Sequence, residues 1–218
     1  MNRPVTAAPV LDGPAGRLET LLDLPRDAGI RGAAVVCHPH PQHGGTMHNK
    51  VAHTLARSFA LQGFAALRFN FRGTEGSEGD WDAGVGEVDD ALTAAAWMRA
   101  EYPDLPLWIS GFSFGAAMAI KAAQRETFAG LVSVAPAVSR FAADPVPQPA
   151  CPWLIVQGDA DELVSADETI EWVNSLEPGP ELVVLSDVEH FFHGRLVDLR
   201  ELVTGFVTRH LDESYVEA

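Results

Sequence analysis

The pentapeptide GFSFG carries the residue of this sequence best suited to act as a nucleophile, Ser113. An apolar run precedes the serine and small residues with a helical pattern follow it, so we expect it at a strand-to-helix junction. A sharp turn there exposes the hydroxyl on a rigid backbone, and it requires small residues two positions to either side, here Gly111 and Gly115. The helix start adds a backbone N–H, that of Phe114, which can bind an oxyanion. The pattern predicts a nucleophile elbow; a tight turn with a capping serine is the alternative.

A nucleophilic serine of this kind needs a carboxylate and a histidine, and after an elbow they follow in that order along the chain. The first partner is expected in DADELV, which follows the apolar run WLIVQG and offers Asp159, Asp161 and Glu162. Asp159 comes directly after the run and is expected to hold the turn. Asp161 lies further into the loop, where it can reach a histidine above the sheet. We therefore predict Asp161 as the acid, with Asp159 and Glu162 as alternatives.

The second partner is expected in VEHFFHG, which follows the apolar run ELVVLSD and offers His190 and His193. His190 comes directly off the predicted strand, whereas His193 lies at the start of the last helix, where capping or a solvated surface position is the ordinary role. His190 is therefore predicted as the base, with His193 as the alternative. In this arrangement the histidine accepts the proton of Ser113, and Asp161 orients the ring and stabilises its cation.

A histidine-rich loop, CHPHPQHGGTMHNK, follows the first long apolar run. In proteins with a nucleophile elbow, the loop at this place in the sheet supplies a second oxyanion donor. Alignment with an H-G-x loop assigns this donor to the backbone N–H of His40. His38 and His40 also form an H-x-H pair that could bind zinc, and packing of the imidazoles beneath the site is a third interpretation. The later loop NFRGTEGSEG lacks the lysine and spacing of a phosphate-binding loop, and Arg72 in it is expected to hold the loop by an ion pair.

These loops must be positioned by elements that alternate along the chain. Apolar runs of strand length lie at 17–25, 32–38, 64–71, 105–110, 129–136, 153–158 and 181–187. Helical patterns lie at 47–62, 86–101, 114–124 and 165–176, and a last helix places Leu196, Leu199, Leu202, Phe206 and Val207 inward. The alternation predicts an α/β protein with a mostly parallel sheet of seven or eight strands and helices on both faces. We expect one domain over residues 1–218, with 17–25 as an edge strand and the functional groups on loops after the carboxyl ends of strands.

The composition limits the classes of partner. Thirty acidic residues against 15 basic ones give a formal net charge of −15. A surface that acidic repels nucleic acid phosphates and anionic lipid headgroups, so neither a nucleic acid nor a membrane is expected as a partner. The two cysteines, Cys37 and Cys151, form no disulfide framework, and the first residues do not resemble a signal peptide. We predict a cytoplasmic protein.

Five segments in order resemble the small lidless serine hydrolases of the α/β-hydrolase superfamily: CHPHPQHGGTMHNKV, RFNFRGTEGSEG, GFSFGA, GDADELV and EHFFHGRL. The similarity runs from about residue 30 to residue 210. It implies an eight-stranded α/β-hydrolase sheet with carboxylesterase-like chemistry. We expect the protein to use no cofactor and no metal. Carried over position by position, the resemblance makes Ser113 the nucleophile, Asp161 the acid and His190 the base, and it forms the oxyanion hole from the backbone N–H groups of His40 and Phe114.

The sequence departs from common hydrolases at Pro39, where an H-G loop has glycine. The segment AVSRFAADPVPQPAC is too short to form the helical cap of lidded relatives, so the pocket is expected to be open and the substrates to be small, short-chain acyl esters. A thioesterase or a peptidase using the same three residues is an alternative, because the same chemistry attacks all three kinds of acyl carbon. A non-catalytic member of the fold that binds a small ligand or a protein is the alternative from another functional class.

Overall fold

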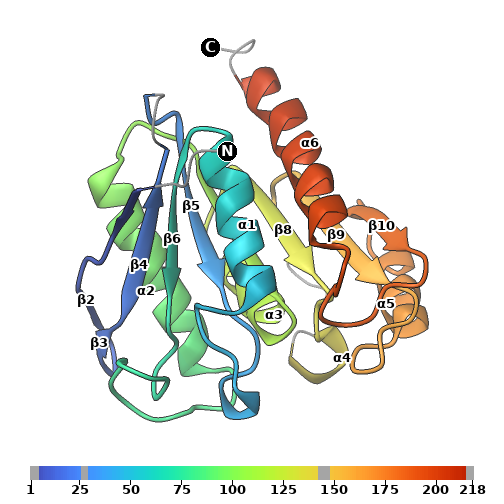
Figure 1. Cartoon of the computed structure of the whole chain (residues 1–218), viewed down its shortest axis with the longest axis horizontal. Helices are drawn as coiled ribbons and strands as arrows, with labels where there is room; N and C mark the ends of the chain where they lie inside the picture. Colours follow the sequence, from blue (N-terminus) through green and yellow to red (C-terminus); the bar gives the residue numbers. More distant parts are fainter. Residues whose placement is uncertain (1–4, 26–28, 142–147, 215–218) are drawn as a thin grey trace.

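The core of the protein is an eight-stranded sheet with strand order β1-β4-β6-β5-β7-β8-β9-β10 (Figure 1). This computed structural model describes residues 5–25, 29–141 and 148–214. The strands are β1 (Val5–Ala7), β4 (Thr20–Leu24), β5 (Gly32–Cys37), β6 (Phe64–Phe69), β7 (Leu107–Phe112), β8 (Gly130–Val134), β9 (Trp153–Gly158) and β10 (Glu181–Leu185). All neighbouring strands from β6 to β10 pair in parallel, and β4 pairs antiparallel with both β1 and β6. The predicted α/β class and mostly parallel sheet are confirmed.

The sheet is covered on both faces, which explains why its strands are continuous apolar runs. Successive side chains of a strand point to opposite faces. In β5, Val35 and Cys37 pack into one buried cluster and Ala34 and Val36 into another on the far face. Each strand from β5 to β9 is buried at every position, as expected of a parallel sheet between two helical layers.

Two helical layers hold the sheet between them. One layer contains α1 (Lys50–Leu61) and α6 (Leu196–Ser214), which pack on each other in front of the strands in Figure 1. The opposite layer contains α2 (Gly86–Glu101), α3 (Phe114–Arg125) and α5 (Ala166–Asn174). Of the residues predicted to face inward on the last helix, Leu199, Phe206 and Val207 are buried and Leu196 and Leu202 are partly buried.

The prediction of one edge strand at 17–25 is wrong. The chain divides this segment at Glu19, whose backbone N–H donates to Ser77 Oγ at 2.9 Å. The first half, β3 (Gly16–Leu18), pairs with β2 (Leu11–Gly13) in a separate hairpin, and the second half is β4. Because β1 pairs with β4 on its outer side, β4 lies inside the sheet and β1 forms the edge of the described sheet.

Two boundaries also differ from the prediction. The first helix begins at Lys50 rather than at Met47, because Asn49 caps it by accepting hydrogen bonds from the N–H groups of Val51 and Ala52. Met47 is buried all the same, and its N–H donates to Asn70 Oδ1 at 2.8 Å. The last strand ends at Leu185 rather than at residue 187, since Asp187 has a positive φ of 57°.

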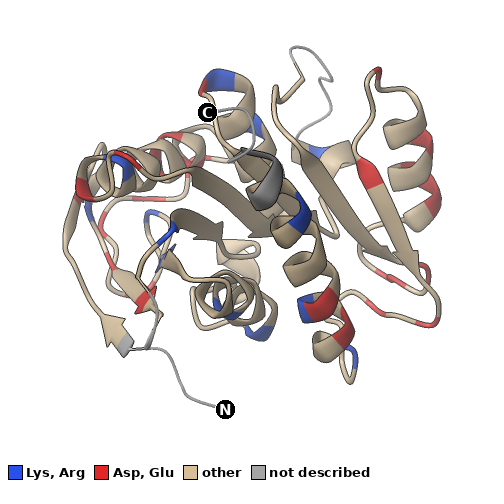
Figure 2. Ribbon diagram, turned by 90° about the horizontal axis from the view of Figure 1, so that it is seen from above, with Lys and Arg blue, Asp and Glu red and all other residues tan. Residues whose placement is uncertain are grey.

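Acidic residues gather along α5 at one end of the molecule (Figure 2). Two of them, Asp167 and Glu168, lie in the first turn, where the positive end of the helix dipole stabilises negative charge. Ser165 caps the same helix, accepting from the Glu168 N–H at 3.3 Å. No helix in the described ranges combines the length and the apolar character needed to cross a lipid bilayer.

Loops at the carboxyl ends of β5, β7, β8, β9 and β10 meet at one edge of the sheet, the lower edge in Figure 1. The short helices η1 (Pro41–His43) and α4 (Val138–Phe141) lie in two of these loops. Between β8 and β9, where a cap would be inserted, the described residues form α4 and the connection 148–152, while 142–147 lie outside the described residues. All the residues predicted to be functional therefore come to this edge.

Candidate functional site

Ser113 lies on a sharp turn between β7 and α3. Its backbone adopts φ 55° and ψ −117°, a conformation that L-residues rarely take and that stores strain. The glycines on either side make the turn possible: a Cβ on Gly111 would collide with the Gly115 carbonyl, and a Cβ on Gly115 would collide with the carbonyl oxygens of Cys37 and His38. The Ser113 hydroxyl makes no capping hydrogen bond to α3, so it is available to other partners.

His190 reaches this hydroxyl from the loop after β10. Its Nε2 lies 3.1 Å from Ser113 Oγ and its Nδ1 lies 2.7 Å from Asp161 Oδ2. An ionised carboxylate can only accept, so Nδ1 carries the proton of the neutral ring and Nε2 is left to accept the Ser113 proton. The side chain of His190 is 3% exposed and that of Asp161 is 0% exposed, so water competes little for these hydrogen bonds.

Asp161 is fixed by four hydrogen bonds. Its Oδ1 accepts from the N–H groups of Leu163 and Val164, and its Oδ2 accepts from His190 and from Gln157 Nε2. Burial of the carboxyl acts to raise its pKa, but the hydrogen bonds from His190 and from the backbone outweigh burial and lower the pKa of Asp161. The group is therefore an anion held facing the imidazole.

The alternative acids and the alternative base have other partners. Asp159 is exposed and accepts the N–H of Asp187 at 2.7 Å, which ties together the loops after β9 and β10. Glu162 accepts the backbone N–H of His190 at 3.2 Å and so holds the histidine's main chain rather than its ring. His193 is exposed and pairs with Glu189. The structure joins Ser113, His190 and Asp161 in one row of hydrogen bonds. Asp159, Glu162 and His193 take no part in it.

His38 is completely buried beneath the loop after β5. Its Nε2 accepts the Phe71 N–H at 3.0 Å, so the proton is on Nδ1, which donates to the Pro39 carbonyl at 2.6 Å. Burial lowers the pKa of His38 to about 4, against the opposing effect of the hydrogen bond to Pro39. Both ring nitrogens are engaged, so His38 in this arrangement offers no lone pair to the metal of an H-x-H site. In the described part of the chain, no three His, Cys, Asp or Glu side chains form a group that could hold a metal ion.

The hydrogen bond from His38 orients a backbone donor. The Pro39 carbonyl and the His40 N–H belong to one planar peptide unit, and in a trans unit they point in opposite directions. By drawing the carbonyl to its own ring, His38 turns the His40 N–H away from itself. Neither this N–H nor that of Phe114 donates a hydrogen bond to a described residue. Because Gly115 packs against the His38 carbonyl, the two donors are carried by chain segments in close contact.

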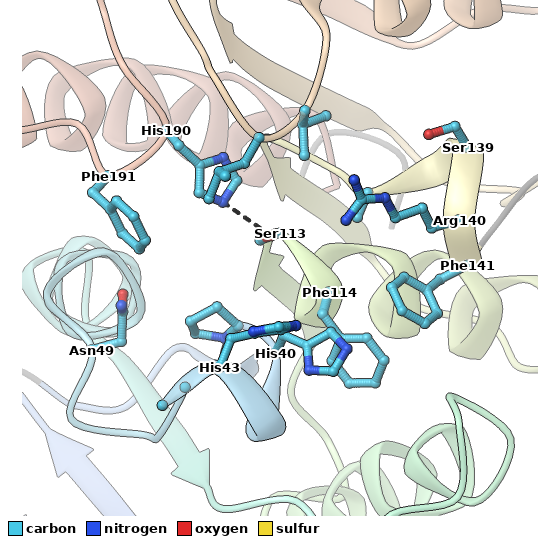
Figure 3. Close-up of a pocket in the computed structure, with 16 residues that line it drawn as sticks. His40, His43, Asn49, Ser113, Phe114, Ser139, Arg140, Phe141, His190 and Phe191 are labelled. Carbon is cyan, nitrogen blue, oxygen red and sulfur yellow. Dashed lines mark hydrogen bonds between the residues drawn. The ribbon is translucent and has the colours of Figure 1, made fainter.

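A cavity of about 270 Å³ opens above Ser113 and His190. Figure 3 shows His40 and His43 on one side of it, Phe191 and Asn49 on a second, and Arg140 and Phe141 from α4 on a third. The His40 ring packs against rings of Phe114 and Phe141, with centroids 5.2 and 5.6 Å away. The interpretation that imidazoles of this loop pack beneath the site therefore holds for His38, whose ring lies 4.8 Å from that of Phe71, and the His40 ring packs at the side of the cavity.

Two residues that support the site were not identified from the sequence. Gln157, on β9, is completely buried and donates to Asp161 Oδ2 at 3.1 Å and to the Val164 carbonyl at 3.1 Å. An amide within the apolar run WLIVQG is the signal that could have revealed it. Arg140 lies in AVSRFAAD, which carries no motif. Arg72 holds its loop as predicted, through hydrogen bonds of 3.0 and 2.8 Å from Nε and Nη2 to Asp90.

The fold has relatives among known proteins. Residues 32–150 match the family described as serine aminopeptidase, S33. The crystal structure of XC6422 from Xanthomonas campestris, described as an α/β serine hydrolase without a lid, is 43% identical, with a TM-score of 0.89 over 94% of each chain. The chain belongs to the α/β serine hydrolases. The eight-stranded sheet of this α/β hydrolase agrees with the resemblance drawn from the five sequence segments, and the residues described between β8 and β9 form no cap domain.

Two further relatives extend the similarity of this α/β hydrolase. An α/β serine hydrolase homologue from Coxiella burnetii is 44% identical, with a TM-score of 0.86 over 91% of this chain and 95% of that one. The protein RP471 of Rickettsia prowazekii is 32% identical over 210 residues, which cover 90% of this chain and 86% of that one. The similarity thus extends over most of each of these chains.

Proposed function

We propose that this hydrolase cleaves short-chain carboxylic esters through an acyl-enzyme intermediate, with Ser113 as nucleophile, His190 as base and Asp161 as the acid that orients it. The observation that carries the proposal is the hydrogen-bonded row of carboxylate, imidazole and hydroxyl, with steps of 2.7 and 3.1 Å. Ser113, which supplies the hydroxyl, lies on a strained turn at the start of a helix and lines the cavity.

The chemistry follows from the proton positions. Ser113 Oγ attacks the carbonyl carbon of the ester while its proton passes to His190 Nε2. The N–H groups of His40 and Phe114 bind the negative oxygen of the tetrahedral intermediate. When the intermediate collapses, the alcohol leaves with the proton from His190 and the acyl group remains on Ser113. A water molecule then gives a proton to His190 and attacks the acyl-enzyme. When this second tetrahedral intermediate collapses, His190 returns the proton to Ser113 Oγ, which releases the acid and regenerates both the serine and the base.

The size of the cavity supports small substrates. At about 270 Å³ it lies just below the ~300–1,000 Å³ range of small-molecule sites. We expect acetyl and butyryl esters to be turned over faster than long-chain esters. Equal or greater kcat/KM values for long-chain esters would contradict this substrate assignment.

A labelling experiment tests the mechanism. A fluorophosphonate probe reacts with an activated serine hydroxyl, and we expect one adduct, on Ser113, located by peptide mass spectrometry. Ser113→Ala should abolish the adduct and the hydrolysis of 4-nitrophenyl butyrate. Ser175→Ala is the matched control, since Ser175 is exposed at the far end of α5 and outside the cavity lining. Undiminished labelling of Ser113→Ala would refute the assignment of the nucleophile.

A peptidase is the second candidate, favoured by the description of the matching family as serine aminopeptidase. The same row of residues attacks amides as well as esters, so the comparison must be made on substrates. Aminoacyl 4-nitroanilides and the corresponding aminoacyl esters, assayed side by side with Ser113→Ala as blank, distinguish the two. A nitroanilide kcat/KM close to that of the ester would favour the peptidase.

A further inference from the structure

Arg140 extends from α4 toward Ser113 and lines the cavity (Figure 3). Its guanidinium forms no ion pair and no hydrogen bond with any residue that the structure describes. Seven other arginines each pair with a carboxylate: Arg17, Arg68, Arg72, Arg99, Arg125, Arg195 and Arg209. In a chain with a net charge of −15, an arginine at the candidate active site thus has no carboxylate partner among the residues that the structure describes, whereas seven other arginines do.

The surroundings of Arg140 suit a bound anion. Phe141 and Val164, both half-buried, line the same cavity and partly shield an ion pair formed there from water, while Arg140 and Leu163 are exposed. A guanidinium presents its N–H donors in a planar fork that matches the two oxygens of a carboxylate. The charge of Arg140 already acts on the site, since it contributes, after burial and His43, to lowering the pKa of His40.

Acidic residues on the side of Arg140 that faces away from Ser113 restrict where an anion can bind. There the arginine borders a second groove, which is lined by the carboxylates of Asp159, Glu162 and Asp167. These acids form no ion pair with Arg140, and they repel an anion from the groove. An anionic group is therefore attracted to Arg140 on the side of Ser113 and not on the side of the groove.

We propose that Arg140 binds a carboxylate of the substrate, so that the esters cleaved at Ser113 are small carboxylate-bearing esters. The carboxylate belongs to the acyl part, as in the half-ester of a dicarboxylic acid, or to the alcohol part, as in an ester of a hydroxy acid. This assignment rests on the proposed esterase function and adds to it the substrate class.

Three esters that differ at one group distinguish a carboxylate on the acyl part from a carboxylate on the alcohol part. Ethyl butyrate is the neutral reference. Monoethyl succinate replaces the terminal methyl of its acyl chain by a carboxylate, and carboxymethyl butyrate replaces the terminal methyl of its alcohol. Values of kcat/KM from titration of the released acid at constant pH give the ratio of each charged ester to ethyl butyrate. We expect a ratio above one for one of the two, and we expect Arg140→Gln to lower that ratio about tenfold.

Two variants control the experiment. Arg140→Lys keeps the charge without the fork and should retain part of the ratio. Arg99→Gln makes the same change in net charge on the surface, where Arg99 pairs with Glu126, and should leave the ratio unchanged. Added salt should lower the ratio in the wild type more than in Arg140→Gln. If the wild type and Arg140→Gln give the same ratio, the role of Arg140 is overturned while the proposed esterase function stands. Absence of Ser113-dependent cleavage of all three esters would overturn the proposed function.

Discussion

The buried imidazole of His38 makes the stability of this hydrolase depend on pH in a calculable way. Burial lowers its pKa from 6.5 to about 4, so between these values the unfolded chain binds a proton that the folded chain excludes. The stability that His38 contributes is therefore complete above pH 6.5 and is lost as the pH falls toward 4. With these two pKa values, linkage gives a loss of about 2 kcal/mol between pH 8 and pH 5.

Urea unfolding of the wild type and His38→Asn at pH 8, 6 and 5 measures this loss. Asparagine can still donate to the Pro39 carbonyl but does not titrate, and the other ionisable groups are common to both proteins. We expect the wild type to be the more stable at pH 8, because the variant leaves the buried Phe71 N–H without an acceptor. That advantage should shrink by about 2 kcal/mol at pH 5. His48→Asn, on the exposed part of the same loop, is the control. An advantage that is equal at pH 8 and pH 5 would refute the reasoning.

Further variants test the elements that hold the site. Gly115→Ala places a methyl against the carbonyl oxygens of Cys37 and His38, so we expect a loss of about 1–3 kcal/mol in urea unfolding and a lower kcat. Asp161→Asn should lower kcat for butyrate esters by about 10³–10⁴ while circular dichroism stays unchanged, because the amide favours the wrong tautomer of the histidine. Asp90→Asn removes the carboxylate that is hydrogen-bonded to the buried Arg72 and leaves it only the longer ion pair with Asp82 at 3.9 Å, so urea unfolding should show a loss of about 3 kcal/mol.

The sequence predicted most of the fold because parallel strands buried on both faces are visible as short apolar runs. Each strand from β5 to β9 overlaps one of these runs, and α2 spans the predicted residues 86–101. The prediction failed where structure depends on contacts made at a distance. β1 has three residues, too short to carry a pattern, and Glu19 divides the run at 17–25 through bonds to Ser77 and Asn70, which lie far along the chain.

At the site, local constraint decides what a sequence can reveal. The turn at Ser113 requires small neighbours at fixed spacing, so Gly111 and Gly115 indicate the turn in the sequence. The choice of Asp161 over Asp159 and Glu162 used only the position of each in its loop, and the structure brings Asp161 to His190. Arg140 has no fixed spacing to Ser113, since only the fold carries α4 to the cavity, and no pattern in the sequence could identify it.

The hydrogen bonds of the site leave a consistent set of groups unpaired. Asp161 is saturated by its four donors, and His38 uses both ring nitrogens on the backbone. Among the groups without a partner in the described residues are the N–H of His40, the N–H of Phe114 and the guanidinium of Arg140, all on residues lining one cavity, and the buried Nδ1 of the His40 ring is unpaired as well. The first three point to the kind of group that the cavity binds. All three are donors, and donors without acceptors favour an anion. Two N–H groups suit the charge that develops on a reacting carbonyl, and the arginine suits a charge that the substrate already carries.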